Sequence, residues 1–139
     1  MLDHVGFAVA DLQRSRRFYE AALRPLGIAL LYEIAPELTE AGGTALGFGS
    51  EGKAFFWIGD NERPGEGTHV AFTADSRATV RAFYAAGVGA GGRDNGAPGL
   101  RPHYHEHYYG AFLVDPDGFN VEAVCHKPEL ADANLHHRL

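Results

Sequence analysis

The sequence has few of the features that mark secreted, membrane-spanning or nucleic-acid-binding chains. It contains one cysteine, Cys125, among 139 residues, so an internal disulfide is impossible and a reducing, cytoplasmic location is expected. Its longest apolar runs are far too short to cross a bilayer, and its N-terminus lacks the basic and apolar regions of a signal peptide. The formal net charge is −6 and no basic cluster stands out. Neither a membrane nor a nucleic acid is therefore an expected partner.

What the sequence does contain is a regular alternation of apolar segments with turn and capping residues. In the first half, Asp11 is a good N-cap for a helix that ends at Pro25 and Gly27. In the second half, Asp75 or Ser76 is the cap of a helix that ends at Gly87. The pattern predicts helices over 12–23 and 77–86 and strands near 2–9, 28–34, 44–48, 53–58, 68–73, 108–114 and 119–124, with an irregular loop over 87–107.

The two halves repeat one another. His4-Val5-Gly6-Phe7 matches His69-Val70-Ala71-Phe72 at an offset of 65 residues, and Phe18-Tyr19 matches Phe83-Tyr84 at the same offset. Each half is therefore predicted to contain a strand, a helix and three further strands. Its sheet has one apolar face, which must be covered by packing against another unit. The repeat predicts a single α+β domain over 1–139. It consists of two repeats, about 1–60 and 67–125, and a short C-terminal tail.

The segment from Tyr108 to Val124 predicts a hairpin about Asp115-Pro116-Asp117-Gly118. If these four residues form the turn, Ala111 faces Glu122 and Tyr109 faces Val124. Glu122 is the only charged residue in the second strand. Because an isolated buried charge is costly, this carboxylate must face either solvent or a compensating group.

Four positions related by the repeat form a candidate metal site. The offset relates His4 to His69 and Trp57 to Glu122. If the halves are related by a pseudo-two-fold axis, His4, His69 and Glu122 converge as two imidazoles and one carboxylate. This ligand set is typical of non-haem Fe(II) and is also used by Zn, Mn, Co or Ni, and it leaves positions open for substrate.

An alternative interpretation of these residues stays open. A histidine in a strand is commonly a hydrogen-bonded structural residue, and Glu122 could be a strand charge that faces solvent. For Trp57 we expect a substrate-binding role as a cavity wall whose indole N–H donates to a ligand.

Histidines recur at every second position just before the hairpin. His103, His105, His107 and then Tyr109 share one face if this segment is extended. Tyr109 or His107 could then be an acid/base group, and Tyr109 could also bind substrate. The alternative is a solvated loop rich in histidine, and the sequence does not decide the role of His103, His105 or His107.

At these residues the chain resembles the vicinal oxygen chelate superfamily, also called the glyoxalase/bleomycin resistance/dioxygenase proteins. The matching pieces, in chain order, are Leu2-Asp3-His4-Val5, Val9-Ala10-Asp11-Leu12 with Phe18-Tyr19, Thr68-His69-Val70-Ala71-Phe72, and Phe112 to Glu122. The resemblance implies two βαβββ modules that pair into a half-open, cup-shaped mixed β-sheet around a divalent metal ion, Fe, Mn, Ni or Zn. It also implies that His4, His69 and Glu122 are the ligands.

The resemblance implies two classes of function. The first is a metal-dependent enzyme with lyase, isomerase or extradiol-dioxygenase chemistry on a small oxygen-chelating substrate, with Glu122, Tyr109 and His107 as candidate catalytic residues. Trp57 departs from the two-carboxylate pattern of glyoxalase I-like members, whereas two histidines and one glutamate match the extradiol dioxygenase-like members. The second class is a metal-free small-molecule binding protein of the bleomycin-resistance type. A homodimer is expected, and the sequence leaves open whether the modules pair within one chain or across the dimer.

Overall fold

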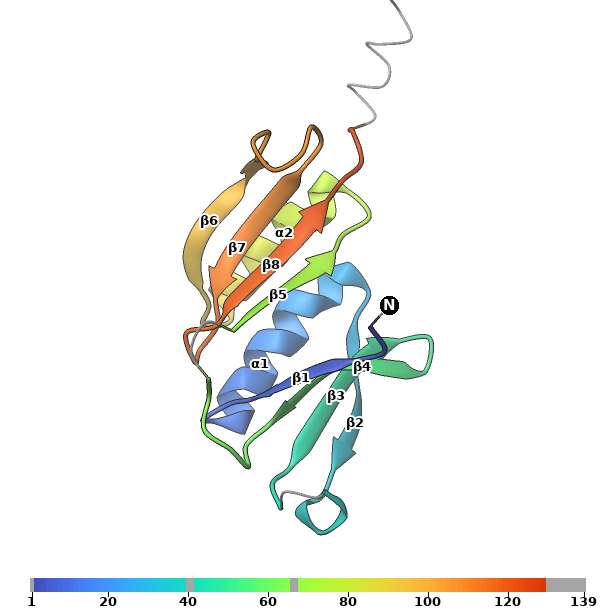
Figure 1. Ribbon diagram of the computed structural model, residues 1–139, viewed down its shortest axis with the longest axis vertical. Coiled ribbons are helices and arrows are strands. Elements are labelled where there is room, and N and C mark those ends of the chain that lie inside the picture. Colours follow the sequence, from blue (N-terminus) through green and yellow to red (C-terminus); the bar gives the residue numbers. More distant parts are fainter. Residues whose placement is uncertain (1, 40–41, 66–67, 130–139) are drawn as a thin grey trace, which may run out of the picture.

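The computed structural model describes residues 2–39, 42–65 and 68–129. The first half contains β1, α1, two short 3-10 helices and three further strands, and the second half contains β5, α2 and three strands (Figure 1). Their bounds are β1 Val5–Ala8, α1 Leu12–Leu23, η1 Arg24–Leu26, β2 Ala29–Ile34, η2 Pro36–Leu38, β3 Ala45–Ser50, β4 Lys53–Gly59, β5 His69–Thr73, α2 Arg77–Gly89, β6 Arg93–Leu100, β7 Tyr109–Val114 and β8 Asn120–Cys125.

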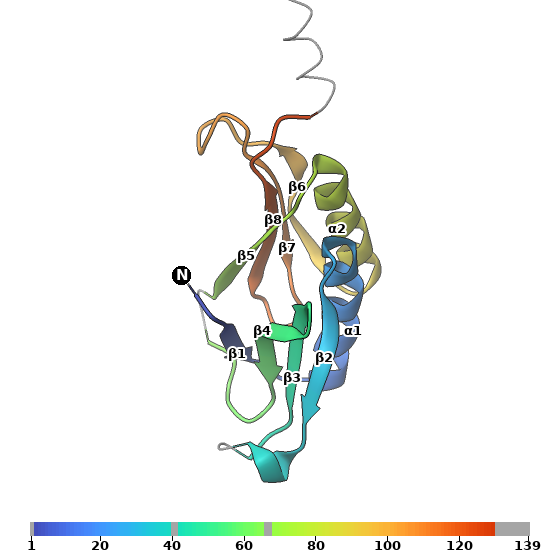
Figure 2. The same cartoon turned by 90° about the vertical axis from the view of Figure 1, so that its right-hand side faces the viewer.

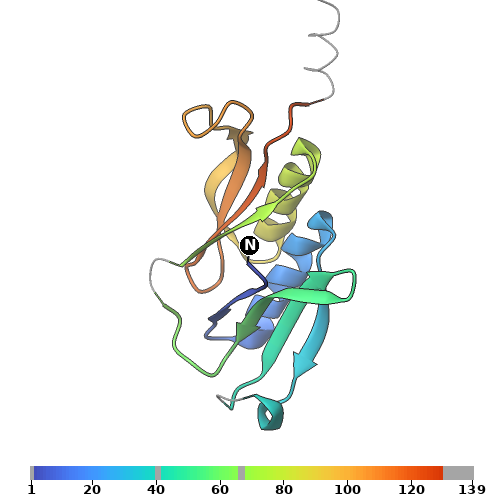
Figure 3. The same ribbon diagram turned by 45° about the vertical axis from the view of Figure 1, so that its right-hand side comes forward.

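The strands form two four-stranded mixed sheets, one from each half. The orders are β1-β4-β3-β2 and β5-β8-β7-β6, with β1 parallel to β4 and β5 parallel to β8. Both helices lie on the same side of the sheets and contact one another (Figures 2 and 3). The α+β fold class of paired βαβββ modules is thereby confirmed. We call the side of each sheet that faces away from the helices its open face.

The offset of 65 residues holds at the level of strand register. Gly6 lies opposite Trp57 in the first module, and Ala71 lies opposite Glu122 in the second. The helices also begin at equivalent residues, Leu12 and Arg77. Trp57 and Glu122 therefore occupy the same place in two copies of one scaffold.

Side chains of the preceding residues cap both helices as the sequence predicts. Asp11 accepts a hydrogen bond from the backbone N–H of Arg14, and Ser76 accepts one from that of Thr79. These bonds satisfy N–H groups that have no partner inside the helix. Each helix start is thus fixed by its local sequence, and the helices bury one face against the sheets.

One apolar core joins the modules. Phe56 from the first sheet packs edge-on against Phe72 from the second, with 5.2 Å between ring centroids. Phe7 packs in the same way against Phe119 at 4.8 Å. Because these rings come from both halves, neither module buries its apolar face alone.

The β7–β8 turn also bonds to the first module. Tyr19 of α1 donates a buried hydrogen bond of 2.6 Å to Oδ2 of Asp115. Oδ1 of Asp117 accepts from the backbone N–H of Ala10 at 2.9 Å, and Oδ2 accepts from the hydroxyl of Ser15 at 3.2 Å. The Asp-Pro-Asp-Gly turn therefore connects the second hairpin to the start of α1.

Two details of the second module differ from the sequence prediction. Residues 93–100 form β6 instead of a loop. Pro98 fits there because β6 is an edge strand with irregular pairing to β7, so its missing N–H costs no ladder bond.

The predicted hairpin register is wrong by one residue. Val114 pairs with Asn120 and Phe112 pairs with Glu122, so five residues, 115–119, make the connection. The physical reason is the Asp115 carboxylate, whose Oδ1 accepts from the N–H groups of both Asp117 and Phe119. These bonds draw Phe119 into the turn.

Among the described residues, no helix is long and apolar enough to cross a membrane. Most of the C-terminal tail, with His136 and His137, lies outside the described residues.

Candidate functional site

His69 and Glu122 lie side by side on the open face of the second sheet. Val121 and Ala123 belong to the buried core under the helices, so Glu122 between them points to the open face. Nε2 of His69 lies 3.2 Å from Oε1 of Glu122. The structure therefore brings together two of the three predicted metal ligands.

The hydrogen bonding of His69 leaves Nε2 available as a ligand atom. Nδ1 of this ring lies 3.1 Å from the backbone carbonyl oxygen of Asn120, which can only accept. In the neutral tautomer that donates from Nδ1 to this carbonyl, the lone pair is on Nε2 beside the carboxylate. Metal-bound histidines commonly donate their other N–H to a carbonyl or a carboxylate in this way.

The spacing of the two atoms suits a metal ion. A cation bonded to each atom at about 2.1 Å, with an angle of about 90 to 110° between the bonds, holds them about 3.0 to 3.4 Å apart. The observed 3.2 Å lies within that range. His69 and Glu122 therefore fit a divalent metal as two of its three protein ligands.

Glu122 is buried although it faces the open side, with 2% of its surface exposed. The hydroxyl of Tyr108, which immediately precedes β7, contacts Oε2 of Glu122. Oε1 faces His69. The carboxylate is thus held asymmetrically, with one oxygen on a phenol and the other beside an imidazole.

His4 lies apart from this pair, just before β1. Its Nδ1 is 2.8 Å from Oδ1 of Asp3, and Nζ of Lys53 donates to Oδ2 of the same carboxylate. The hydrogen bond from Lys53, followed by that from His4, lowers the pKa of Asp3 below its usual range. Because the ionised Asp3 can only accept, neutral His4 also has its lone pair on Nε2.

The expected convergence of His4, His69 and Glu122 within one chain does not occur. In the part of the chain that the structure describes, no group of three His, Cys, Asp or Glu side chains is close enough to hold a metal ion. His4 immediately precedes β1 and His69 begins β5, and these two strands are the edges of separate sheets. The assignment of the three residues as ligands stays a prediction.

Trp57 lies on the open face of the first sheet, in the position equivalent to Glu122. Its ring stacks near-parallel to that of Tyr32, with 14° between the planes and 6.4 Å between centroids. Gly47 lies between their strands, and a Cβ added there would come within 2.7 Å of the indole. Because Gly47 has no side chain, the indole of Trp57 can lie across β3. There the indole forms a half-buried aromatic surface.

Tyr109, predicted to be catalytic and to bind substrate, faces the helices instead. Its hydroxyl accepts a hydrogen bond of 3.2 Å from Arg81, and the guanidinium of Arg77 lies 5.3 Å from its ring centroid. The physical reason is the shifted hairpin register, which moves Tyr109 to the opposite face from Glu122 and brings Tyr108 to it.

The predicted catalytic residue His107 lies in the loop between β6 and β7. Its Nε2 is 3.9 Å from the carboxylate of Glu106, and its backbone N–H donates to His105. His103 and His105 are exposed in the same loop. This segment forms turns instead of an extended strand, so its histidines do not share one face, and no described contact joins them to Glu122.

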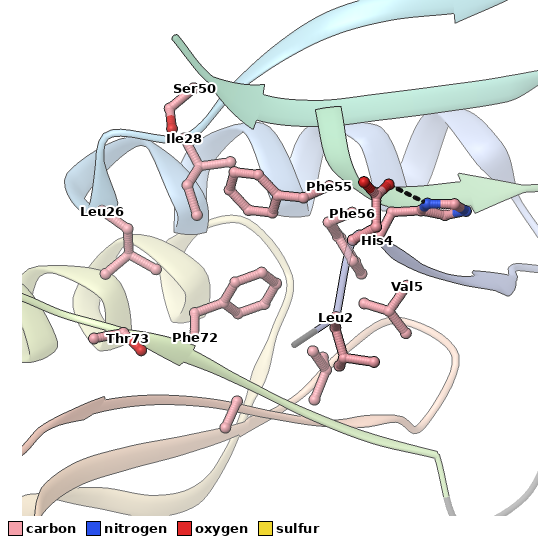
Figure 4. Close-up of a pocket in the computed structure, with 13 residues that line it drawn as sticks. Leu2, His4, Val5, Leu26, Ile28, Ser50, Phe55, Phe56, Phe72 and Thr73 are labelled. Atoms are coloured by element: carbon pink, nitrogen blue, oxygen red, sulfur yellow. Dashed lines mark hydrogen bonds and ion pairs between the residues drawn. The ribbon is translucent and has the colours of Figure 1, made fainter. Parts of the chain in front are cut away.

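A mainly apolar cavity of about 400 Å³ separates the edge strands β1 and β5 (Figure 4). Val5 and Phe55 line it on the first module, and Val70 and Phe72 line it on the second. His4 is also part of its wall, but its ring points away from Phe72 (Figure 4). Leu2 is 83% exposed beside it. The cavity therefore lies between the edges of the two sheets.

Sequence reasoning missed Tyr108 and Tyr32. The position of Tyr108 depends on the hairpin register. The five-residue connection places Tyr108 on the same face of the sheet as Glu122. Tyr32 could have been found by strand pairing, because it and Trp57 both lie opposite Gly47.

A family model described as Glyoxalase/Bleomycin resistance protein/Dioxygenase superfamily matches residues 1–123. Among solved structures, a glyoxalase/bleomycin resistance protein from Albidiferax ferrireducens T118 is 31% identical, with a TM-score of 0.71. The alignment covers 92% of this chain and 99% of that one. A comparison with curated proteins found no match.

Glyoxalase I from Zea mays is 28% identical, with a TM-score of 0.68. The alignment covers 99% of this chain but 50% of that one, so this chain spans about half of the maize enzyme. A glyoxylase/bleomycin resistance protein/dioxygenase domain from Frankia sp. EAN1pec shares the fold, with a TM-score of 0.69 at 17% identity.

Proposed function

The chain belongs to the glyoxalase/bleomycin resistance protein/dioxygenase superfamily, and on that premise we propose that it is a divalent-metal-dependent enzyme acting on a small oxygen-chelating substrate. The observation that carries the proposal is the pair of His69 and Glu122. Nε2 of His69 lies 3.2 Å from Oε1 of Glu122, and the carboxylate of Glu122 is buried. When bound, the metal would polarise two neighbouring oxygens of the substrate.

The third protein ligand in this proposal is His4 of a second copy of the chain. Two features support a homodimer that completes the site. The edge strands β1 and β5 are open, and Leu2 and Val5 expose apolar surface beside the cavity between them. Open strand edges and exposed apolar surface both favour association. His4 resembles His69 in having Nδ1 bonded to an acceptor, so both rings would present Nε2 to one ion.

The reaction belongs to the lyase, isomerase or extradiol-dioxygenase type. Trp57 occupies the place equivalent to Glu122, so the site would have one carboxylate instead of two. Two histidines and one carboxylate would suit Fe(II) and would leave enough open positions for a chelating catechol together with O2, whereas Zn or Ni would suit isomerisation of a hydroxycarbonyl compound. A cytoplasmic location accompanies this proposal as a prediction.

Metal titration tests this proposal. Protein stripped with a chelator is titrated by calorimetry with Ni, Zn and Mn, and anaerobically with Fe(II), and each loaded form is assayed on a catechol and on a hemithioacetal. We expect saturable binding that His69→Ala and Glu122→Gln each weaken by about 100-fold or more, because the first removes a ligand atom and the second removes the negative charge of a ligand. Glu106→Gln, a change at an exposed carboxylate, is the matched control. A parent protein that binds none of these metals contradicts the proposal.

A metal-free binding protein is the second candidate, and the aromatic surface of Trp57 and Tyr32 favours it. A flat aromatic compound would stack on this surface and quench the fluorescence of Trp57, the only tryptophan. Quenching that persists in excess chelator and disappears in Tyr32→Leu supports this function. Quenching that requires added metal supports the enzyme instead.

A further inference from the structure

The loop between β6 and β7 holds Tyr108 at Glu122. The backbone N–H of Arg101 donates to the carbonyl of Tyr108 at 2.7 Å, which closes the base of the loop. The guanidinium of Arg101 donates to the carbonyls of Gly99 at 2.7 Å and Gly110 at 3.2 Å. Arg101 therefore bonds to both strands that flank the loop, and Tyr108 is fixed relative to β7.

The Tyr108 ring is also held on its sides. The rings of Tyr104 and His126 each pack edge-on against it, both with 5.2 Å between centroids. Beneath it lies Gly110, where an added Cβ would come within 3.1 Å of the tyrosine ring and 3.5 Å of Oε2 of Glu122. A side chain larger than glycine at this position would therefore require the ring to shift by a few tenths of an ångström.

Tyr108 is the donor in its contact with Glu122. Tyr108 carries a phenol, a group whose ordinary pKa is about 10. The phenol therefore keeps its proton at neutral pH, and an ionised carboxylate can only accept. Oε2 is thus engaged by the phenol, while Oε1 remains directed at Nε2 of His69.

We infer that Tyr108 is a positioning residue that holds Oε2 of Glu122, so that the carboxylate presents only Oε1 to the metal. This inference rests on the proposed metal site. Without the phenol, the carboxylate is free to rotate about its last torsion, which has a broad energy profile. Both oxygens can then approach the ion, and the alignment of Oε1 with His69 is lost.

Cobalt binding to Tyr108→Phe tests the inference without any assay of activity. The phenylalanine keeps the ring that packs on Tyr104 and His126 and removes only the hydroxyl. We expect the Kd for Co(II) to rise about 10- to 100-fold, as is typical when a group that orients a metal ligand is removed. We also expect the visible absorption of bound Co(II) to change, because the number of oxygen ligands changes.

Two further variants separate positioning from general damage. Tyr109→Phe removes a hydroxyl from the adjacent residue, which bonds to Arg81 on the helix side, and should leave both the Kd and the cobalt spectrum unchanged. Gly110→Ala retains the Tyr108 hydroxyl but displaces its ring, and should reproduce the spectral change of Tyr108→Phe to a smaller degree.

The outcomes distinguish this inference from the proposed function. If the parent binds Co(II) and Tyr108→Phe has the same Kd and spectrum, the positioning role is overturned and the metal site stands. If Tyr109→Phe weakens binding as much as Tyr108→Phe, the effect is not specific to the contact with Glu122 and the inference is also overturned. If the folded parent binds no Co(II), the metal site and the positioning role both fail.

Discussion

The two modules share a backbone but differ in what they present on the open face. In the first, Trp57 stacks on Tyr32. In the second, the equivalent position is Glu122, which contacts Tyr108 and His69. Strand register is the same in both. The difference teaches that the duplicated scaffold fixes where a side chain points, whereas single substitutions decide whether that position is polar or aromatic.

The modules also differ at their hairpin turns. In the second module the turn contains Asp115 and Asp117, which bond to Tyr19 and Ser15 of α1. The position equivalent to Asp117 in the first module is Gly52, whose φ of 76° suits a tight turn and which has no side chain to donate or accept. Among the described residues, the hydrogen bonds that join a hairpin turn to the other module therefore come from the second module alone.

Breaking that connection should give the largest loss of stability. Asp117→Ala removes the acceptor for the N–H of Ala10 and the hydroxyl of Ser15, and it leaves these groups without their partner. We expect the free energy of unfolding to fall by about 3 kcal/mol, measured by urea denaturation.

The control is Asp75→Ala, a change at an aspartate whose side chain is 95% exposed. It should shift the free energy of unfolding by less than about 0.5 kcal/mol. Equal losses for the two variants would show that the turn does not hold the modules together.

Tyr19 and Tyr84 offer a matched pair at equivalent positions in the two helices. Tyr19→Phe removes the buried bond to Asp115 and should cost about 2 kcal/mol, because the partner is charged. Tyr84 is less buried and bonds to Asp94, so Tyr84→Phe should cost less than Tyr19→Phe. Parallel urea denaturation of both variants measures the difference.

The pH dependence of the Tyr19 contribution has a definite sign. Burial, followed by the charge of Asp115, raises the pKa of Tyr19 well above its usual range. Its stabilising contribution is therefore fully present below the pKa of an unfolded tyrosine and is lost as the pH rises above it. The stability difference between the parent and Tyr19→Phe should narrow above about pH 10. A difference that widens there would contradict this assignment.

The smallest expected effect comes from making the first module resemble the second. In a dimer, Trp57→Glu would add a second carboxylate at the position equivalent to Glu122, and we expect metal affinity to rise about tenfold, or about 1.4 kcal/mol. The control is Trp57→Gln, because glutamine has the shape of glutamate without its charge. Tighter binding in both variants would attribute the effect to loss of the indole instead of gain of a ligand.

Much of the fold could be predicted because it depends on local chemistry. Asp11 and Ser76 mark the helix starts, and the matches at His4 and His69 reveal the repeat. β6 was missed because Gly96, Pro98 and Gly99 have low strand propensity, and an edge strand tolerates them.

The candidate site could be predicted only in part. The pairing of His69 with Glu122 follows from neighbouring parallel strands, which the repeat indicates. The contact of Tyr108 with Glu122 depends on a five-residue connection that the Asp115 carboxylate stabilises, and a count of turn residues does not reveal it. Sequence symmetry also relates His4 to His69 without saying whether the two meet in one chain.

Complementation between two inactive variants tests most directly whether the metal site joins His4 of one copy to His69 and Glu122 of another. His4→Ala and Glu122→Ala chains with different tags are expressed together, and metal binding by the mixture is compared with that of each variant alone. The account predicts that neither variant binds tightly and that random pairing restores about a quarter of the sites, because half of the dimers are mixed and each has one intact site. A mixture that binds no more metal than the separate variants would contradict it.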